Sequence, residues 1–229
     1  MITVSNLSAG YGQSEVIHNV SLEAAPSEIV AIMGRNGMGK TTLFKTLMGI
    51  IHATKGKIAV DGVDVTKLPP YRRVESGIAY VPQGRMIFPN LTVWENILTG
   101  LEVAKSKRIP DDIFSLFPVL KDMRTRKGGN LSGGQQQQLA IARALVANPK
   151  VLLLDEPTEG IQPSIIKDIA AVLLRIRESR KLTILVSEQV LSFTMDIADR
   201  LLVIEGGRFT LEEQRERIDV AEVRRLLAV

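Results

Sequence analysis

The segment GRNGMGKTT at residues 34–42 places the strongest constraint on how this chain folds. An apolar run over residues 29–33 precedes it, and a helical pattern over residues 43–50 follows it. Glycine lets the backbone turn tightly, so that successive N–H groups and the start of the following helix point at anionic oxygens. A strand, this loop and a helix in that order predict a phosphate-binding P-loop.

The residues of this loop have distinct predicted roles toward a nucleoside triphosphate. The Lys40 ammonium would reach the β- and γ-phosphates, the Thr41 hydroxyl would ligate a bridging Mg²⁺, and Thr42 can support the α-phosphate contact. An ordinary glycine-rich turn is the competing interpretation, which the spacing and the flanking pattern disfavour. The candidate nucleotide-binding residues are Gly34, Arg35, Asn36, Gly37, Met38, Gly39, Lys40, Thr41 and Thr42.

A second glycine-containing segment, LSGGQ at residues 131–135, opens another helical pattern far downstream. Ser132 and Gln135 have the spacing of a capping box, and Gly133 and Gly134 allow an anion to approach the free N–H groups of the helix start. We therefore predict that these four residues bind phosphate. Two such helix starts in one chain raise the question of whether both contact the same nucleotide.

Two carboxylates follow the apolar run at residues 151–154, as expected at the end of a buried parallel strand. Asp155 would hold the Mg²⁺ of the P-loop, and Glu156 is placed to polarise a water molecule. Gln83 lies just beyond the apolar run at residues 78–81 and would touch the metal or the attacking water. The alternatives are a helix cap or solvated turn for the two acids and an ordinary loop position for Gln83.

Aromatic residues are few, and most have two possible roles. Tyr11, on a loop between two glycines upstream of the P-loop, can stack on an adenine ring or be a surface tyrosine in a turn. Phe88, Trp94, Phe114 and Phe117 fall within a helical stretch. We favour a core role for these four, because a small lobe must fill itself, over a role as a docking face. Partner docking is nevertheless expected near residues 85–96, because this stretch contains aromatics and follows Gln83.

Composition excludes several function classes. The 229 residues are 45% hydrophobic, which is ample for one α/β domain or two small lobes. The absence of cysteine excludes disulfides and thiolate metal sites. The net charge of +4 is scattered along the chain rather than gathered in a stripe. No apolar run approaches the roughly 20 residues that cross a bilayer, so we expect a soluble chain.

Periodicity predicts an α/β fold with a P-loop core, a mainly parallel sheet, an antiparallel β subdomain and a helical insertion lobe. A hairpin is expected at Asp61-Gly62, a capping box at residues 92–95, and a charged helix over residues 211–227. The glutamines at 135–138 are expected on a solvated helix face. We divide the chain into a core lobe, residues 1–84 and 150–229, and a helical lobe, residues 85–149.

Together these motifs resemble the ATP-binding subunit of ABC transporters over residues 2 to about 208. The resemblance implies that Tyr11 stacks on adenine, that residues 34–42 hold the phosphates and that Gln83 senses the metal and water. It also implies that residues 131–135 are the family signature, Asp155 the metal aspartate and Glu156 the general base. Members of the family bind ATP in a head-to-tail dimer, with the P-loop of one subunit and the signature of the other on each nucleotide.

Two positions depart from the common family pattern. Most members carry Ser-Ala-Leu-Asp after the Asp-Glu-Pro-Thr run, whereas this chain has Glu159-Gly160-Ile161-Gln162. Gln189 stands where most members have a switch histidine, and a glutamine cannot change charge near neutral pH. Both departures resemble the branch that serves branched-chain amino acid importers. Within that branch the motifs look most like those of urea-uptake ATPase subunits.

The resemblance implies an ATPase subunit of an importer for urea, short amides or, next, branched-chain amino acids. ATP and Mg²⁺ are the expected cofactors, and Glu156, Gln83 and Gln189 the expected catalytic residues. The expected partners are a second ABC ATPase subunit, transmembrane permease subunits and, indirectly, a solute-binding protein, but no nucleic acid. This places the chain in the cytoplasm, on the inner face of the membrane. The alternatives are a soluble ABC ATPase acting on nucleic acid or ribosomes, and a P-loop kinase or GTPase.

Overall fold

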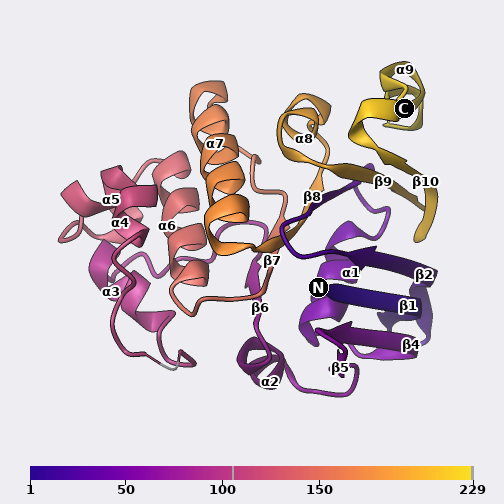
Figure 1. The fold of residues 1–229 in the computed structure, drawn as a ribbon, viewed down its shortest axis with the longest axis horizontal. Coiled ribbons are helices and arrows are strands. Elements are labelled where there is room, and N and C mark those ends of the chain that lie inside the picture. Colours follow the sequence, from indigo (N-terminus) through magenta and orange to yellow (C-terminus); the bar gives the residue numbers. More distant parts are fainter. Residues whose placement is uncertain (105, 228–229) are drawn as a thin grey trace.

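The computed structural model describes residues 1–104 and 106–227, and its strands form two sheets (Figure 1). One sheet is four-stranded and antiparallel, in the order β2-β1-β4-β5. Asp61 and Gly62 both have positive φ in the tight turn between β4 and β5, which confirms the predicted hairpin. The strands of this sheet are β1 (Ile2–Tyr11), β2 (Ser14–Ala24), β4 (Ala53–Val60) and β5 (Val63–Asp64).

The other sheet has six strands in the order β10-β9-β3-β8-β7-β6. All neighbours pair in parallel except β10, which is antiparallel to β9, so the predicted mainly parallel sheet is confirmed. Strands β3, β7 and β8 are buried along their whole length, which explains their continuous apolar runs. The strands are β3 (Ile29–Met33), β6 (Ile78–Val81), β7 (Val151–Asp155), β8 (Thr183–Glu188), β9 (Arg200–Glu205) and β10 (Arg208–Gln214).

Helices cover both faces of the six-stranded sheet. Alternate residues of its strands pack with α1 (Lys40–Met48), which is sandwiched between this sheet and the antiparallel one. The intervening residues pack against helices on the opposite face. Those helices are α6 (Gly133–Leu145), α7 (Pro163–Arg180) and α8 (Leu191–Ile197). This layering brings the carboxyl ends of the parallel strands and the start of α1 to one edge.

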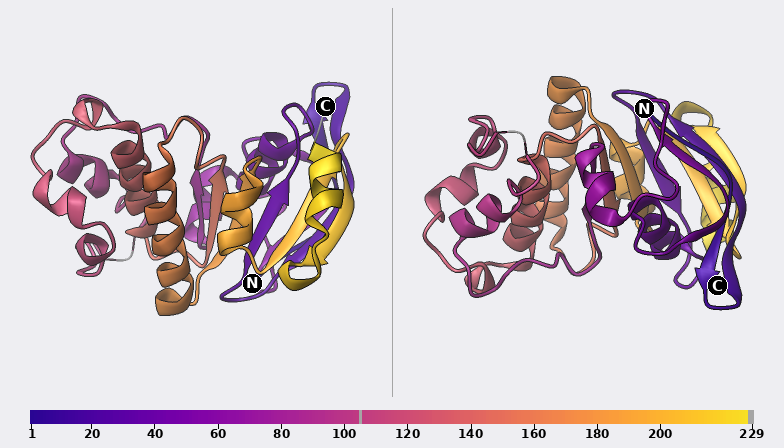
Figure 2. Two further views of the ribbon diagram at one scale, coloured as in Figure 1. Left: turned by 90° about the horizontal axis from the view of Figure 1, so that it is seen from above. Right: turned by 90° about the horizontal axis from the view of Figure 1, so that it is seen from below.

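The short helices gather with α6 at the end of the molecule away from the antiparallel sheet (Figure 2). They are α3 (Val93–Thr99), α4 (Ile113–Leu116) and α5 (Pro118–Asp122), with a 3₁₀ turn at Gly128–Asn130; α2 (Pro70–Glu75) lies apart, before β6. The predicted capping box at Thr92 and Glu95 is confirmed. In the described part of the chain, no helix is both long and apolar enough to span a membrane.

The C-terminal stretch differs from the predicted helix over residues 211–227. It forms β10, a 3₁₀ turn at Arg215–Arg217 and a shorter helix, α9 (Val220–Leu227). Pairing with β9 provides backbone partners for residues that carry mixed charges, and Phe209 and Leu211 point back onto the core. Tertiary pairing therefore outweighs the local helical pattern.

The prediction of a solvated face for residues 135–138 is also wrong, because Gln137 and Gln138 are buried. Helix α6 contacts α3, α7 and β6, which leaves little of its surface free. The predicted core role of the aromatics holds only in part. Phe117 is buried, whereas Phe88 and Trp94 are nearly half exposed, and Trp94 stacks on Phe114 at 5.9 Å between ring centroids.

A buried arginine fixes the far end of α1. The Arg73 guanidinium donates to the carbonyl groups of Thr46 and Leu47 in the last turn of this helix, at 2.7 and 2.8 Å. It also donates to the carbonyls of Thr66 and Leu68. A cation at a helix C-terminus is stabilised by the helix dipole. The helix that begins at the P-loop is thus held rigidly at its other end.

Candidate functional site

The loop between β3 and α1 has the shape that the sequence predicts for a phosphate cradle. A Cβ atom at Gly34 would lie 2.5 Å from the Ile204 carbonyl oxygen, so only glycine fits there. Gly39 has φ of 108° and is the N-cap of α1. Among the described residues, no side chain caps this helix start. Its backbone N–H groups are therefore available to anionic oxygens, which fits a nucleotide phosphate chain.

Lys40 lies inside this loop and is buried. Its ammonium donates to the Gly34 carbonyl at 2.6 Å and to the Arg35 carbonyl at 3.1 Å. It also lies 3.0 Å from Glu156 Oε1. The lysine is thus held where a phosphate in the loop would meet it, and it reaches the carboxylate that the sequence predicts as the base.

Asp155 ends β7 and is hydrogen-bonded by three hydroxyl groups. Ser187 Oγ donates to it at 2.6 Å, the Tyr80 hydroxyl at 3.0 Å and Thr41 Oγ1 at 3.3 Å. Burial raises the pKa of the Asp155 carboxyl, and the hydrogen bonds oppose that rise. Burial, together with the nearby Asp155 charge, also raises the pKa of Tyr80, which therefore stays a neutral donor. Two of the predicted metal ligands, Thr41 and Asp155, are thus side by side.

A divalent cation fits this pair in chemistry and in number of ligands. A hydroxyl and a carboxylate are oxygen ligands of the kind that Mg²⁺ prefers. No group of three or more His, Cys, Asp or Glu side chains that could hold a metal occurs among residues 1–104 and 106–227. Mg²⁺ commonly binds through one or two protein groups, substrate phosphates and water, so the two side chains are sufficient on the protein side.

Glu156 follows directly and points to a different set of partners. Its φ of 49° turns the chain sharply, and its N–H donates to the Ser187 carbonyl at 3.1 Å. Gln189 Nε2 donates to Glu156 Oε1 at 3.1 Å, and Gln83 Nε2 donates to Glu156 Oε2 at 3.3 Å. The two other predicted catalytic residues, Gln83 and Gln189, and Lys40 therefore meet at the Glu156 carboxylate.

Each of the two glutamines has a further partner. Gln189 Nε2 also donates to Asn36 Oδ1 in the P-loop at 2.8 Å. Gln83 Nε2 also donates to Glu159 Oε2 at 3.1 Å. Glu159 is one of the departures from the family pattern, so in this chain the replacement brings a second carboxylate to Gln83. The Gln83 oxygen remains the atom with which this residue would touch a metal ion or water.

The structure does not bring the second phosphate segment to the first. Ser132 caps α6, with Ser132 Oγ accepting from the Gln135 N–H, so the predicted capping box is confirmed. In the described ranges, no hydrogen bond joins residues 131–135 to residues 34–42. A Cβ at Gly134 would lie 2.4 Å from the Ile165 side chain, so close packing of α6 on α7 is a further reason for that glycine.

Tyr11 belongs to the antiparallel sheet and not to the sheet that carries the P-loop. It ends β1 at the tip of the β1–β2 hairpin, where it pairs with Ser14, and its side chain is 53% exposed. An exposed ring on a hairpin tip is open to stacking. The adenine-stacking role of Tyr11 stays a prediction.

Sequence reasoning missed several polar residues of the site, namely Tyr80, Ser187, Glu188 and Glu159. Ser187 pairs with Asp155 across β7 and β8, and Tyr80 lies on β6 beside β7. Both lie toward the carboxyl end of a parallel strand, the same signal that identified Gln83 and Asp155. A search for polar residues at the carboxyl end of every predicted strand would have found Tyr80 and Ser187.

A family model described as ABC transporter matches residues 17–159, which include the P-loop, the signature and the two carboxylates. The chain belongs to the ABC transporter family. It is thus an ATP-binding cassette with ATPase activity, which excludes the P-loop kinase and GTPase alternatives. ATP is the nucleotide that the cassette binds.

Relatives and solved structures extend this similarity over nearly the whole cassette. The high-affinity branched-chain amino acid transport ATP-binding protein BraG of Pseudomonas aeruginosa is 38% identical and covers 93% of this chain and 92% of its own length. The lipopolysaccharide export system ATP-binding protein LptB of Haemophilus influenzae is 35% identical over 95% of this chain and 92% of its own.

Two solved cassettes have the same fold. The ATP-binding cassette MJ1267 of an ABC transporter superposes with a TM-score of 0.86 at 27% identity, over 100% of this chain and 99% of that one. The ATP-binding cassette MJ0796 was solved as a dimer in a post-hydrolysis state with ADP and Pi. It superposes with a TM-score of 0.82 at 25% identity, over 94% of this chain and 99% of that one. The predicted fold class is confirmed.

Proposed function

We propose that this cassette is the ATP-hydrolysing subunit of an importer for a small polar solute, with urea or a short amide as first candidate and branched-chain amino acids as second. The observation that carries the ATPase part is the convergence of Lys40, Gln83 and Gln189 on the Glu156 carboxylate. The departures at Glu159–Gln162 and Gln189 and the similarity to BraG support the importer branch. The preference for urea within that branch rests on the resemblance of residues 35–40, 83–89, 135–138 and 159–164 to urea-uptake ATPase subunits.

In the proposed mechanism, the P-loop amides and Lys40 bind the phosphates, and Glu156 accepts a proton from the attacking water. Gln189 holds Glu156 Oε1 and links it to Asn36 in the P-loop. Thr41 and Asp155 would hold Mg²⁺, which neutralises phosphate charge when bound. Gln83 would place its side-chain oxygen near the metal and the water.

We also propose that the cassette works as a head-to-tail pair with a second copy or a related subunit. The separation of the two phosphate segments within one chain supports this arrangement, because the start of α6 needs a nucleotide from elsewhere. The dimeric MJ0796 structure supports it as well. The cassette would lie on the cytoplasmic face of the membrane, attached through permease subunits, with a solute-binding protein acting on those subunits from the other side.

Ser132→Arg tests whether residues 131–135 act on the nucleotide of a second cassette. The bulky cation at the start of α6 should leave ATP affinity of the isolated chain within about twofold and stop hydrolysis, although loss of the cap should cost about 1 kcal/mol of stability. ATP binding by calorimetry and phosphate release measure the two effects. Ser115→Arg, at an exposed position of α4, is the matched control and should hydrolyse ATP normally. Loss of ATP affinity in isolated Ser132→Arg would show that the signature acts within its own chain.

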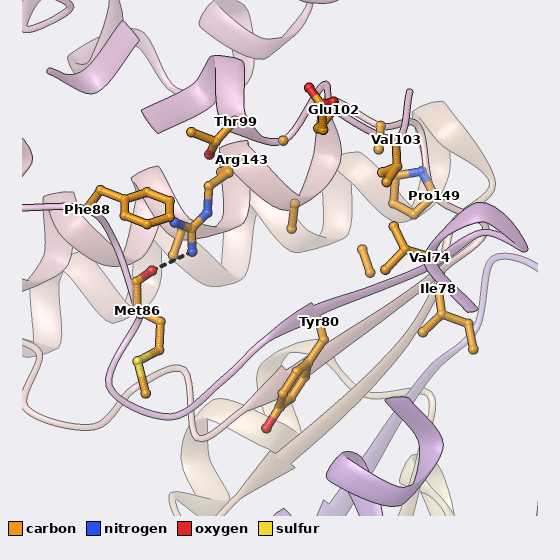
Figure 3. Close-up of a pocket in the computed structure, with 15 residues that line it drawn as sticks. Val74, Ile78, Tyr80, Met86, Phe88, Thr99, Glu102, Val103, Arg143 and Pro149 are labelled. Atoms are coloured by element: carbon orange, nitrogen blue, oxygen red, sulfur yellow. Dashed lines mark hydrogen bonds between the residues drawn. The ribbon is translucent and has the colours of Figure 1, made fainter. Parts of the chain in front are cut away.

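A groove between α6 and β6 is the proposed docking site for the permease (Figure 3). Met86 is 66% exposed and Phe88 49% exposed at its rim. Arg143 Nη2 donates to the Met86 carbonyl at 2.8 Å, and its guanidinium lies 5.4 Å from the centre of the Phe88 ring. The groove adjoins the loop that follows Gln83, so a docked partner would be close to the ATP site.

The predicted docking stretch around residues 85–96 is therefore narrowed to its first part. Trp94 lines a different hollow, together with Phe114, Ile109 and Lys121. Its stacking on Phe114 gives it a packing role in the helical region. Met86 and Phe88 are better candidates for partner contact than Trp94.

Uptake by cells that lack this chain tests the transport proposal. The wild-type chain should restore uptake of labelled urea or acetamide, and leucine uptake should not depend on it. Met86→Asp should keep the ATPase activity of the isolated chain and fail to restore uptake, because a charge in the groove opposes apolar docking; aspartate tolerates the positive φ of this residue. Val63→Asp, at a similarly exposed position on the antiparallel sheet, should restore uptake.

Dependence of leucine uptake alone on this chain would replace the urea assignment with the branched-chain amino acid one. No effect on any of the three solutes would contradict the importer proposal. Full restoration by Met86→Asp would contradict the docking site and leave the solute result unaffected.

A further inference from the structure

Glu188, at the end of β8, is a buried carboxylate with no part in the mechanism above. Its side chain is 2% exposed, and four hydrogen bonds converge on it. Thr158 donates twice to Oε1, from its N–H at 3.0 Å and its hydroxyl at 2.7 Å. The N–H groups of Gln189 and Val190 donate to Oε2 at 2.9 and 3.3 Å.

The four donors belong to two loops that meet in the catalytic site. Thr158 lies two residues after Glu156, in the loop that follows β7. Gln189 and Val190 begin the loop that follows β8. The same two loops are joined again by the hydrogen bond from Gln189 Nε2 to Glu156 Oε1, at 3.1 Å. Each oxygen of Glu188 therefore holds one side of the Glu156–Gln189 contact.

We propose that Glu188 is a positioning residue for ATP hydrolysis, which fixes the loops of Glu156 and Gln189 relative to each other. This inference rests on the proposed roles of Glu156 as base and Gln189 as its positioning partner. The Glu188 side chain has its hydrogen-bond partners in Thr158, Gln189 and Val190 and not in the P-loop or the Thr41–Asp155 pair, so it acts on the hydrolytic step rather than on nucleotide binding. A buried carboxylate is costly unless it is fully hydrogen-bonded, and here both oxygens are used.

Glu188→Gln separates this role from simple packing. Glutamine has the same size, but its amide offers one acceptor oxygen and one NH₂ donor. In one orientation the NH₂ group can donate to the Thr158 hydroxyl, but the Thr158 N–H loses its acceptor. In the other orientation the N–H groups of Gln189 and Val190 both lose theirs. The loop then shifts, and the Glu156–Gln189 contact loosens. Glu188→Asp keeps both acceptor oxygens on a side chain that is one methylene shorter. It should therefore still hold the two loops together in part.

The test uses the full chain and measures kcat, the KM for ATP, ATP affinity and thermal stability. Glu188→Gln should lower kcat by about 10-fold or more, with KM and ATP affinity within about twofold of wild type. Glu188→Asp should lie between Glu188→Gln and wild type, and it decides the question if the amide variant does not fold. Glu75→Gln, exposed on α2 and paired with Arg72, is the matched control and should show normal kcat.

A double variant adds a readout that a structural role would not change. If Glu188 acts through Gln189, the kcat loss in Glu188→Gln/Gln189→Ala should be smaller than the product of the two single losses. A loss equal to that product, or a normal kcat in Glu188→Gln, would overturn the inference. Glu156→Gln is measured in parallel: rapid hydrolysis there refutes the proposed base itself, whereas a slow Glu156→Gln beside a normal Glu188→Gln refutes only the role of Glu188.

Discussion

Lys40→Ala is expected to weaken ATP binding by about 10- to 100-fold and to bring hydrolysis below detection. The ammonium is a buried, flexible cation enclosed by the loop, where it donates to the Gly34 and Arg35 carbonyls. A hydrogen bond to a charged group contributes about 1.5–3 kcal/mol, which sets the expected loss of affinity. Titration with ATP and steady-state phosphate release measure the two effects.

Lys45→Ala is the matched control for this prediction. Lys45 lies in the last turn of the same helix and is partly exposed. Its removal changes the charge by the same amount, so a general electrostatic effect would appear in both variants. Lys45→Ala should keep normal affinity and turnover. Near-normal ATPase activity of Lys40→Ala in the assembled transporter would refute the P-loop assignment.

Glu156→Gln is expected to lower steady-state hydrolysis by about 10²–10⁴-fold, the usual contribution of a placed general base, while ATP binding is kept. The amide has the same size as the carboxylate but cannot accept the proton of the attacking water. Glu75→Gln serves again as the control for the same chemical change at an exposed position.

Glu156→Gln should also make the head-to-tail pair of cassettes detectable. With hydrolysis blocked, ATP-bound cassettes should accumulate as a closed pair, either of two copies or with a related subunit. Size measurement with and without Mg-ATP, on the chain alone and with its transporter partners, checks this. A monomer under all of these conditions would contradict the proposed head-to-tail site.

Local patterns were sufficient to predict most of the fold and the centre of the site. The P-loop lies between β3 and α1 as expected, because the apolar run, the glycines and the helical pattern all favour the same arrangement. Asp155 and Thr41 meet because Asp155 ends β7 and Thr41 lies at the start of the helix that follows β3, a parallel strand of the same sheet. The hairpin at Asp61-Gly62 and the caps at Thr92 and Ser132 followed from local chemistry alone.

Other features depend on pairing and packing that the local sequence does not contain. The segment after Gly207 has mixed charges, and only its pairing with β9 makes it a strand. Gln137 and Gln138 are polar, yet helices on both sides bury them. The roles of Ser187 and Glu188 depend on the register of β8 against β7, which brings Ser187 beside Asp155. The distance between the P-loop and the signature is likewise a tertiary property.

Single-turnover hydrolysis distinguishes Glu156 as the base from Gln189 as its positioning partner. The wild type, Glu156→Gln and Gln189→Ala are loaded with ATP under saturating conditions, and cleavage of the γ-phosphate is followed in time. We expect cleavage to slow by about 10²–10⁴-fold in Glu156→Gln and by a clearly smaller factor in Gln189→Ala. Near-normal cleavage in Glu156→Gln together with none in Gln189→Ala would exclude Glu156 as the base and move the base to residues 187–189.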